Sequence, residues 1–178
     1  GMELTVSVEP QRAGTAGALH HARGLLADEF VLLNGDTWLD VNFLGLQALR
    51  RAAGVPAAMA LRRVEDASRY SLVDLAGQRI TCFGAGQADA GGGGWINGGV
   101  VACTRSLLDR VPAKGALEEL VWPQLAREGG LAGMHRVRMG AQVGDLATGS
   151  RVLGQHAEVV VTGQGGLPGF QRVGPHQG

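Results

Sequence analysis

The chain has 178 residues, of which 45% are apolar and 18% charged, and its formal net charge is zero. This length suits one domain with a real core, and the neutral balance gives no indication of a nucleic-acid or polyanion partner. No apolar run reaches a membrane-spanning length and no leader peptide is visible. We therefore predict a cytoplasmic protein with neither a nucleic-acid nor a membrane partner.

The first third of the chain alternates strand and helix patterns. Residues 4–8 alternate apolar and polar side chains, which predicts a strand. Residues 15–27 have helical spacing, with Thr15 as the expected N-cap. The continuous apolar run at 30–35 predicts a strand covered on both faces, as in a parallel sheet. A helix at 42–54, capped by Asn42 and ended by Gly54, and a strand at 57–62 follow. This order is typical of a three-layer α/β fold.

The pattern changes in the second part of the chain. Residues 71–83 predict a hairpin with its turn at Ala76 and Gly77. Residues 95–104 predict another apolar strand, followed by two short helices, and residues 157–163 predict a last strand. The run from Gly91 to Gly94 is typical of a flexible loop. We expect one domain over residues 2–162 and a disordered tail over 163–178, because the tail is rich in Gly, Pro and Gln.

The sequence "FVLLNGDTWLDVNF" places a carboxylate, Asp36, directly after the predicted strand at 30–35. Ligands of open α/β sheets bind beyond the carboxyl ends of the strands. A carboxylate at such a position can hold a divalent cation that bridges phosphate oxygens. An Asx-turn or a helix-capping role is the alternative, and for Asp36 considered alone this alternative is favoured. Asp40, which precedes the next helix, is expected to cap it or to stay solvated.

Other motifs carry weaker signals. The segment "GTAG", Gly14 to Gly17, begins a predicted helix, where backbone N–H groups suit an anionic or polar ligand. Small residues are common at such positions, and the segment lacks the Gly-Lys-Ser/Thr of a P-loop. His20 and His21 are adjacent on a helix and point in different directions, so they cannot share a metal. Cys82 and Cys103 lack a metal or redox spacing and are expected to be reduced core residues.

Five segments together resemble a known family. In chain order they are "EPQRAGTAGAL", "FVLLNGDTWLDVNF", "ALRRVEDASRYSLVDL", "WINGGVVACTRSLLDRVP" and "LEELVWPQL". They resemble the sugar-phosphate nucleotidyltransferases, in particular the heptose-1-phosphate and mannose-1-phosphate guanylyltransferases, over about residues 4–125. The resemblance implies a Rossmann-like α/β/α fold with a mixed sheet. It also implies transfer of a nucleoside monophosphate, GMP from GTP, to a sugar 1-phosphate with release of pyrophosphate, giving a nucleotide-sugar for cell-surface polysaccharide.

The same resemblance assigns roles to residues of this chain. Asp36 inherits the role of ligand to a catalytic Mg²⁺. The nucleotide is expected to contact five small residues: Gly14, Thr15, Ala16, Gly17 and Gly35. The sugar pocket is expected to include residues from two further segments: Arg69, Tyr70, Ser71, Asn97 and Gly98. The chemistry is an in-line attack on the α-phosphorus, which depends on positioning and charge neutralisation.

The chain also departs from the family pattern. It begins past the family's first strand and phosphate loop, so the fold is expected to lack the first β-α-β-α unit. Lys114 is the only lysine, and Gln142 stands where the family has a second metal-binding Asp, with Asp145 at the wrong offset. A sheet without its central strand exposes an edge, which predicts strand pairing with a second copy of the chain. The alternatives to an enzyme are an inactive nucleotide-sugar-binding or regulatory module, and a truncated gene product.

Overall fold

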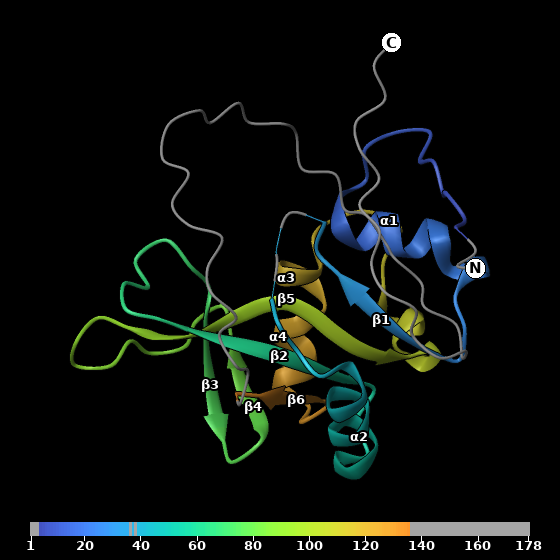
Figure 1. The fold of residues 1–178 in the computed structure, drawn as a ribbon. Coiled ribbons are helices and arrows are strands. Elements are labelled where there is room, and N and C mark those ends of the chain that lie inside the picture. The colour runs from blue at the N-terminus through green and yellow to red at the C-terminus, as the bar shows by residue number, and fades with distance from the viewer. Residues whose placement is uncertain (1–3, 36, 38, 136–178) are drawn as a thin grey trace.

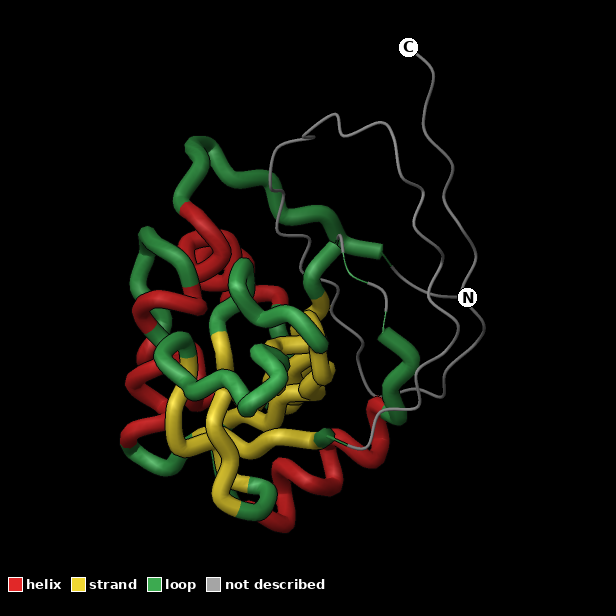
Figure 2. Tube along the Cα trace, turned by 90° about the vertical axis from the view of Figure 1, so that its left-hand side faces the viewer, coloured by secondary structure: helices red, strands yellow, loops and turns green. Residues whose placement is uncertain are grey.

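A mixed six-stranded sheet forms the centre of the molecule, with helices on both of its faces (Figures 1 and 2). The computed structural model describes residues 4–35, 37 and 39–135. The strand order is β1-β5-β2-β6-β4-β3, and β3 also pairs with β5. The strands are β1 (Glu29–Leu33), β2 (Ala57–Val64), β3 (Leu72–Ala76), β4 (Arg79–Phe83), β5 (Gly94–Thr104) and β6 (Leu131–Met134). The predicted α/β class with a mixed sheet is confirmed.

Strand directions bring three carboxyl ends to one edge of the sheet. Both β1 and β2 run antiparallel to β5, so they are parallel to each other, and β6 is parallel to β2. The C-termini of β1, β2 and β6 therefore meet at the same edge. This is the edge at which open α/β sheets bind their ligands.

Helices cover the sheet in two layers. They are α1 (Gly14–Ala22), α2 (Phe43–Ala53), α3 (Leu117–Leu120) and α4 (Trp122–Arg127), with 3-10 turns η1 (Arg23–Leu25) and η2 (Arg105–Arg110). One apolar core joins α1, α3 and α4 to Phe30 and Leu32 of β1, whereas Val31 belongs to a second core under α2. Both faces of β1 are therefore covered, as its continuous apolar run predicts.

The ends of α2 follow from local sequence. The side chain of Asn42 accepts a hydrogen bond from the N–H of Gly45 at 3.0 Å, as an N-cap does. At the other end Gly54 has φ +63°, the left-handed conformation that ends many helices. The predicted cap and terminator are both confirmed.

Two predictions for the N-terminal part are wrong. Residues 4–8 form no strand, because no described strand lies beside them to supply hydrogen bonds. Thr15 does not cap α1, which begins one residue earlier and has Ala13 at the N-cap without a side-chain hydrogen bond. Instead, the Thr15 hydroxyl accepts the N–H of Leu117 at 2.8 Å and donates to Glu118 at 3.1 Å. It thereby caps the start of α3.

Two turns also differ from prediction. The β3–β4 turn falls at Gly77 and Gln78, one residue later than expected, with Gly77 at φ +63°. The predicted flexible loop before β5 is instead organised by Asp89. One oxygen of this side chain accepts the N–H groups of Gly91 and Gly93, each at 3.0 Å, and the other pairs with Arg63. The Arg63 guanidinium and these N–H groups hold the pKa of Asp89 below its usual value.

The predictions for the cysteines can be compared with the structure, whereas those for the last strand and the tail fall on residues that the structure does not describe. Cys82 and Cys103 are both free. Cys103 is a core residue, as predicted, and burial raises the pKa of its thiol. Cys82 is only half-buried, so its predicted place in the core is wrong. The predicted strand at 157–163 and the predicted tail lie outside the described residues. Among the helices that the structure describes, none has the length and apolar character needed to cross a membrane.

Candidate functional site

The segment after β1 lies directly against the middle of β5. The backbone N–H of Asn34 donates to the carbonyl of Gly99 at 2.8 Å. The N–H of Thr37 then donates to the carbonyl of Asn34 at 3.4 Å, which turns the chain beyond the strand end. Two segments that the sequence analysis singled out separately, at 34–35 and at 97–98, are therefore neighbours at the carboxyl edge of the sheet.

A bulge in β5 shapes this contact. Between the pairs Met59–Val101 and Leu61–Asn97, β5 contains more residues than β2, so its chain bends out of register. Gly99 adopts φ +80°, which an L side chain rarely tolerates. The side chain of Asn97 accepts the N–H of Gly99 at 2.9 Å and fixes the bend.

Gly98 lets the chain after β1 approach β5 closely. A Cβ at this position would lie 2.5 Å from the Leu39 side chain and 2.9 Å from the backbone oxygen of Ala60. The Leu39 side chain can shift, but the backbone of β2 cannot move without disturbing the sheet. The glycine is therefore required by protein packing, independently of any ligand.

We expect Gly98→Ala to destabilise the fold by about 1–3 kcal/mol, because the added methyl overpacks a filled contact. A thermal melt measures this as a lower Tm. Gly24→Ala is the matched control: Gly24 has an ordinary φ, and a Cβ there meets nothing within 4 Å. Equal melting temperatures for the two variants would contradict the close approach at Gly98.

The predicted sugar-side segment at 69–71 lies next to the same edge. It precedes β3, whose Leu72 pairs with Ile96, the neighbour of Asn97. The Tyr70 ring is half exposed, and the Arg62 guanidinium lies 5.8 Å from its centroid in a cation–π contact. Arg69 and Ser71 are exposed. The structure thus brings 69–71 and 97–98 into one neighbourhood, and their roles in sugar binding remain predictions.

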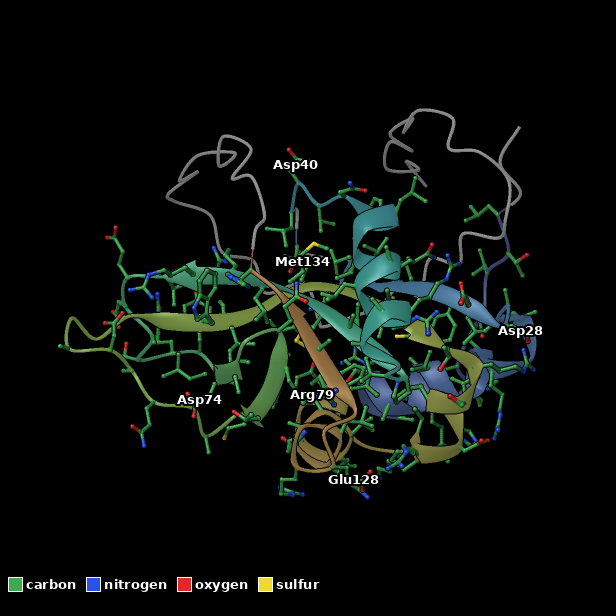
Figure 3. The ribbon with its side chains drawn as sticks, turned by 90° about the horizontal axis from the view of Figure 1, so that it is seen from below. Asp28, Asp40, Asp74, Arg79, Glu128 and Met134 are labelled. Atoms are coloured by element: carbon green, nitrogen blue, oxygen red, sulfur yellow. The ribbon has the colours of Figure 1, made fainter. Side chains whose placement is uncertain are left out.

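The predicted metal ligand, Asp36, lies outside the described residues, as do Gln142 and Asp145. Gly35, beside Asp36, is exposed. The described residues contain no group of three metal-ligating side chains. One carboxylate is a sufficient protein contribution when substrate phosphates complete the Mg²⁺ shell. Asp40 is exposed and points away from the sheet, in agreement with its predicted solvated state (Figure 3).

The predicted nucleotide segment at the start of α1 packs against another loop. A Cβ at Gly14 would lie 2.4 Å from the backbone oxygen of Gly115, and one at Gly17 would lie 3.0 Å from that of Ala113. The N–H of Ala16 also donates to the Gly115 oxygen, at 3.0 Å. These glycines are therefore explained by helix packing, and the expected nucleotide contact at 14–17 remains a prediction.

Thr15 offers a test of that packing role. We expect Thr15→Val to destabilise the fold by about 1 kcal/mol, because the N–H of Leu117 loses its hydroxyl acceptor. Thr15→Ser keeps the acceptor and is expected to retain most of the stability. Chemical denaturation of the three proteins measures the difference, and a valine variant as stable as the wild type would contradict the cap.

Two nitrogen-bearing side chains at this edge, Arg62 and His135, were not predicted from the sequence. Arg62 lies near the carboxyl end of β2, and His135 directly follows β6, where its ring meets Trp95 edge-on with centroids 5.7 Å apart. Arg62 could have been found, because it ends a predicted strand parallel to the strand before Asp36. His135 could not, since the sequence gives no strand signal at 131–134.

A cavity of about 580 Å³ lies at the opposite end of the sheet. Its lining comes from the C-terminus of α2, the start of β2, the end of β5 and η2: Arg50, Gly54, Val55, Pro56, Thr104, Ser106, Asp109 and Arg110. None of the predicted site residues lines this cavity.

The chain is similar in sequence to mannose-1-phosphate guanylyltransferases. The chain is 30% identical over 141 residues to the probable mannose-1-phosphate guanylyltransferase 1 of Oryza sativa, covering 75% of this chain and 39% of that protein. It is 31% identical over 134 residues to the mannose-1-phosphate guanylyltransferase catalytic subunit beta of Dictyostelium discoideum, covering 72% and 37%. No family model matches the sequence. The chain thus spans less than half the length of these curated relatives.

Structure comparison agrees on the fold. A crystal structure of HddC from Yersinia pseudotuberculosis superposes with a TM-score of 0.58 at 21% identity, covering 71% of this chain and 55% of that one. A second structure of HddC, complexed with GMP-PN, gives 0.57. The predicted nucleotidyltransferase-like fold is therefore confirmed. The sequence relatives are guanylyltransferases, the kind of enzyme that the resemblance named.

Proposed function

Because the chain is a relative of the sugar-phosphate nucleotidyltransferases, we propose that it handles a guanine nucleotide and a sugar 1-phosphate. The proposed reaction transfers GMP from GTP to mannose or heptose 1-phosphate and releases pyrophosphate. The product would be a nucleotide-sugar for cell-surface polysaccharide, made in the cytoplasm. A second copy of the chain is a further proposed partner.

One observation carries the proposal most directly. Three segments of the sequence resemblance, with described residues 34, 35 and 37, 69–71 and 97–99, lie together at the carboxyl edge of the sheet. They are far apart in the sequence, so an unrelated fold would have no reason to assemble them there. The edge is also where α/β sheets place phosphates and sugars.

The proposed chemistry relies on charge neutralisation at this edge. Asp36 is the proposed ligand of a Mg²⁺ ion, which would neutralise the phosphate oxygens when bound. Lys114 is exposed and next to Gly115, which packs on α1, so it does not belong to the edge segments. Arg62 is a described cation near the carboxyl end of β2 and is the proposed protein contribution to phosphate binding.

The proposal is tested by pyrophosphate release. We expect the purified chain with Mg²⁺, GTP and mannose 1-phosphate to release pyrophosphate faster than with ATP or UTP. Parallel assays with heptose 1-phosphate and glucose 1-phosphate show which sugar phosphate gives the fastest pyrophosphate release. Release that is independent of the sugar phosphate would indicate simple hydrolysis and contradict the transferase proposal.

A binding module without turnover is the second candidate. It is favoured by the single lysine and by Gln142, which stands where the family has a second metal-binding Asp. Binding of a GDP-sugar without pyrophosphate release would support this candidate over the enzyme. If the chain neither binds a GDP-sugar nor releases pyrophosphate, a truncated gene product is favoured.

A further inference from the structure

The cavity at the amino end of β2 is built around a buried arginine. Arg50 of α2 lines this cavity and is only 5% exposed. Its guanidinium carries more N–H donors than its neighbours supply acceptors for. Nη2 pairs with Glu29, Nη1 reaches the carbonyl of Val55 only at 3.5 Å, and Nε has no hydrogen-bond partner among the described residues. Buried donors are nearly always paired, so Arg50 retains an unusual capacity to attract an acceptor.

The charge around Arg50 is not balanced. Glu29 is shared between Arg50 and Arg51, so one carboxylate serves two guanidinium groups and a net positive charge remains. A second guanidinium, that of Arg110, lines the cavity from η2. It pairs with Glu128 in an ion pair in which both side chains are about 40% exposed, and such pairs are weak. Arg110 can therefore turn toward an anion at little cost.

A hydroxyl donor completes the polar lining. The Oγ atoms of Thr104 and Ser106 lie 2.7 Å apart at the cavity wall. The nearby carbonyl of Pro56 already accepts the backbone N–H of Thr104 at 2.9 Å, and the Thr104 hydroxyl lies 3.4 Å from the same oxygen. The shorter contact favours donation from Thr104 to Ser106. The hydroxyl proton of Ser106 is then available to a ligand in the cavity.

We propose that this cavity binds the phosphate group of a small metabolite, with Arg50 and Arg110 supplying positive charge and Ser106 a hydroxyl donor. Guanidinium groups suit phosphate because they form parallel N–H···O bonds with its oxygens. The volume of about 580 Å³ also leaves room for the organic part of the ligand. The cavity lies at the end of the sheet opposite the carboxyl edge, so the proposal does not depend on the proposed catalytic function.

Asp109 gives the proposal a test of sign. It is the acidic side chain in the cavity lining; it is 81% exposed and lies 4.0 Å from Arg23. Its charge repels an anion in the cavity. We therefore expect Asp109→Asn to bind inorganic phosphate about two- to fivefold more tightly, the range of exposed charge interactions. Weaker phosphate binding in this variant would overturn the proposed anion site.

Nuclear magnetic resonance of the full chain, titrated with inorganic phosphate at constant ionic strength and without Mg²⁺, measures the binding. We expect saturable shifts of the backbone amide signals of Gly54, Val55 and Ser106. Arg110→Gln is expected to raise the dissociation constant at least about tenfold, because a charge-assisted hydrogen bond is lost. Arg127→Gln is the matched control: Arg127 is an exposed arginine of α4 that does not line the cavity, and wild-type affinity is expected.

A further variant separates the two ends of the sheet. Arg62→Gln removes the cation proposed to bind phosphate at the carboxyl edge, and we expect the cavity signals to saturate in it as in the wild type. Phosphate binding that is lost in Arg62→Gln and kept in Arg110→Gln would place the anion at the carboxyl edge and overturn the proposal. Equal affinities of Arg110→Gln and Arg127→Gln, or cavity signals that phosphate does not shift, would also overturn it. Acetate that binds more tightly than phosphate would overturn the assigned ligand class.

Discussion

Glu29→Gln is expected to lower the free energy of unfolding by about 2–4 kcal/mol, because it leaves the guanidinium of Arg50 without its counter-ion. Arg50 lies inside the molecule, with 6% of its side chain exposed, and Glu29 is 29% exposed. Glu29 pairs with Arg50 and also accepts hydrogen bonds from Nε of Arg51 at 3.1 and 3.2 Å. The buried Nε of Arg50 has no hydrogen-bond partner among the described residues. Chemical denaturation at neutral pH measures the loss.

The same ion pair predicts a pH dependence. Hydrogen bonds from Arg51, followed by the charges of Arg50 and Arg51, hold the pKa of Glu29 below its usual value. The stability from this group is therefore complete above the unfolded-state pKa, about 4.3 for a glutamate, and is lost as the pH falls through the lower folded-state pKa. We expect the wild type to lose more stability than Glu29→Gln on acidification through this window.

Glu128→Gln is the matched control for Glu29→Gln. Glu128 also pairs with an arginine, Arg110, but both side chains are about 40% exposed. Exposed ion pairs contribute little, so this variant is expected to keep nearly wild-type stability. Equal losses in the two variants would contradict the buried role of the Glu29–Arg50 pair.

Asp36→Asn is expected to lower Mg²⁺-dependent pyrophosphate release by about 100-fold or more, since a bound cation supplies several kcal/mol of charge stabilisation in phosphoryl transfer. The amide keeps the size of the side chain and removes its charge. The melting temperature of the variant is expected to be unchanged in the absence of nucleotide.

Asp40→Asn is the control for Asp36→Asn. It removes a carboxylate from the same connection between β1 and α2, and the Asp40 side chain points into solvent. We expect full turnover in this variant. Full turnover in Asp36→Asn as well would contradict the assignment of Asp36 as the metal ligand.

Local sequence signals predicted the elements that depend on local contacts. The apolar run before Asn34 predicted β1, and Asn42 and Gly54 predicted both ends of α2, because their hydrogen bonds stay within a few residues. Asp89 could have been predicted in the same way, since an Asp that accepts from N–H groups two and four residues later is a local turn signal.

Predictions that depend on distant partners failed or stayed open. Residues 4–8 have a strand pattern, but a strand also needs a neighbour, and the sequence does not show where that neighbour is. The Thr15 hydroxyl finds its partner 102 residues further along the chain, so its local N-cap signal was misleading. The contact of Asn34 with Gly99 follows from the strand order β1-β5-β2, which adjacent segments alone do not reveal.

We propose that the carboxyl edge, with Asn34, Gly35 and residues 97–99, binds a guanine nucleotide-sugar. Thermal melting of the chain with Mg²⁺ and increasing GDP-mannose tests it most directly, with UDP-glucose at the same concentrations as the comparison. Ligand that binds only the native state raises Tm in proportion to the logarithm of its concentration above Kd. We predict a cooperative transition whose Tm rises with GDP-mannose and rises less with UDP-glucose. A cooperative transition that neither ligand shifts would contradict the claim.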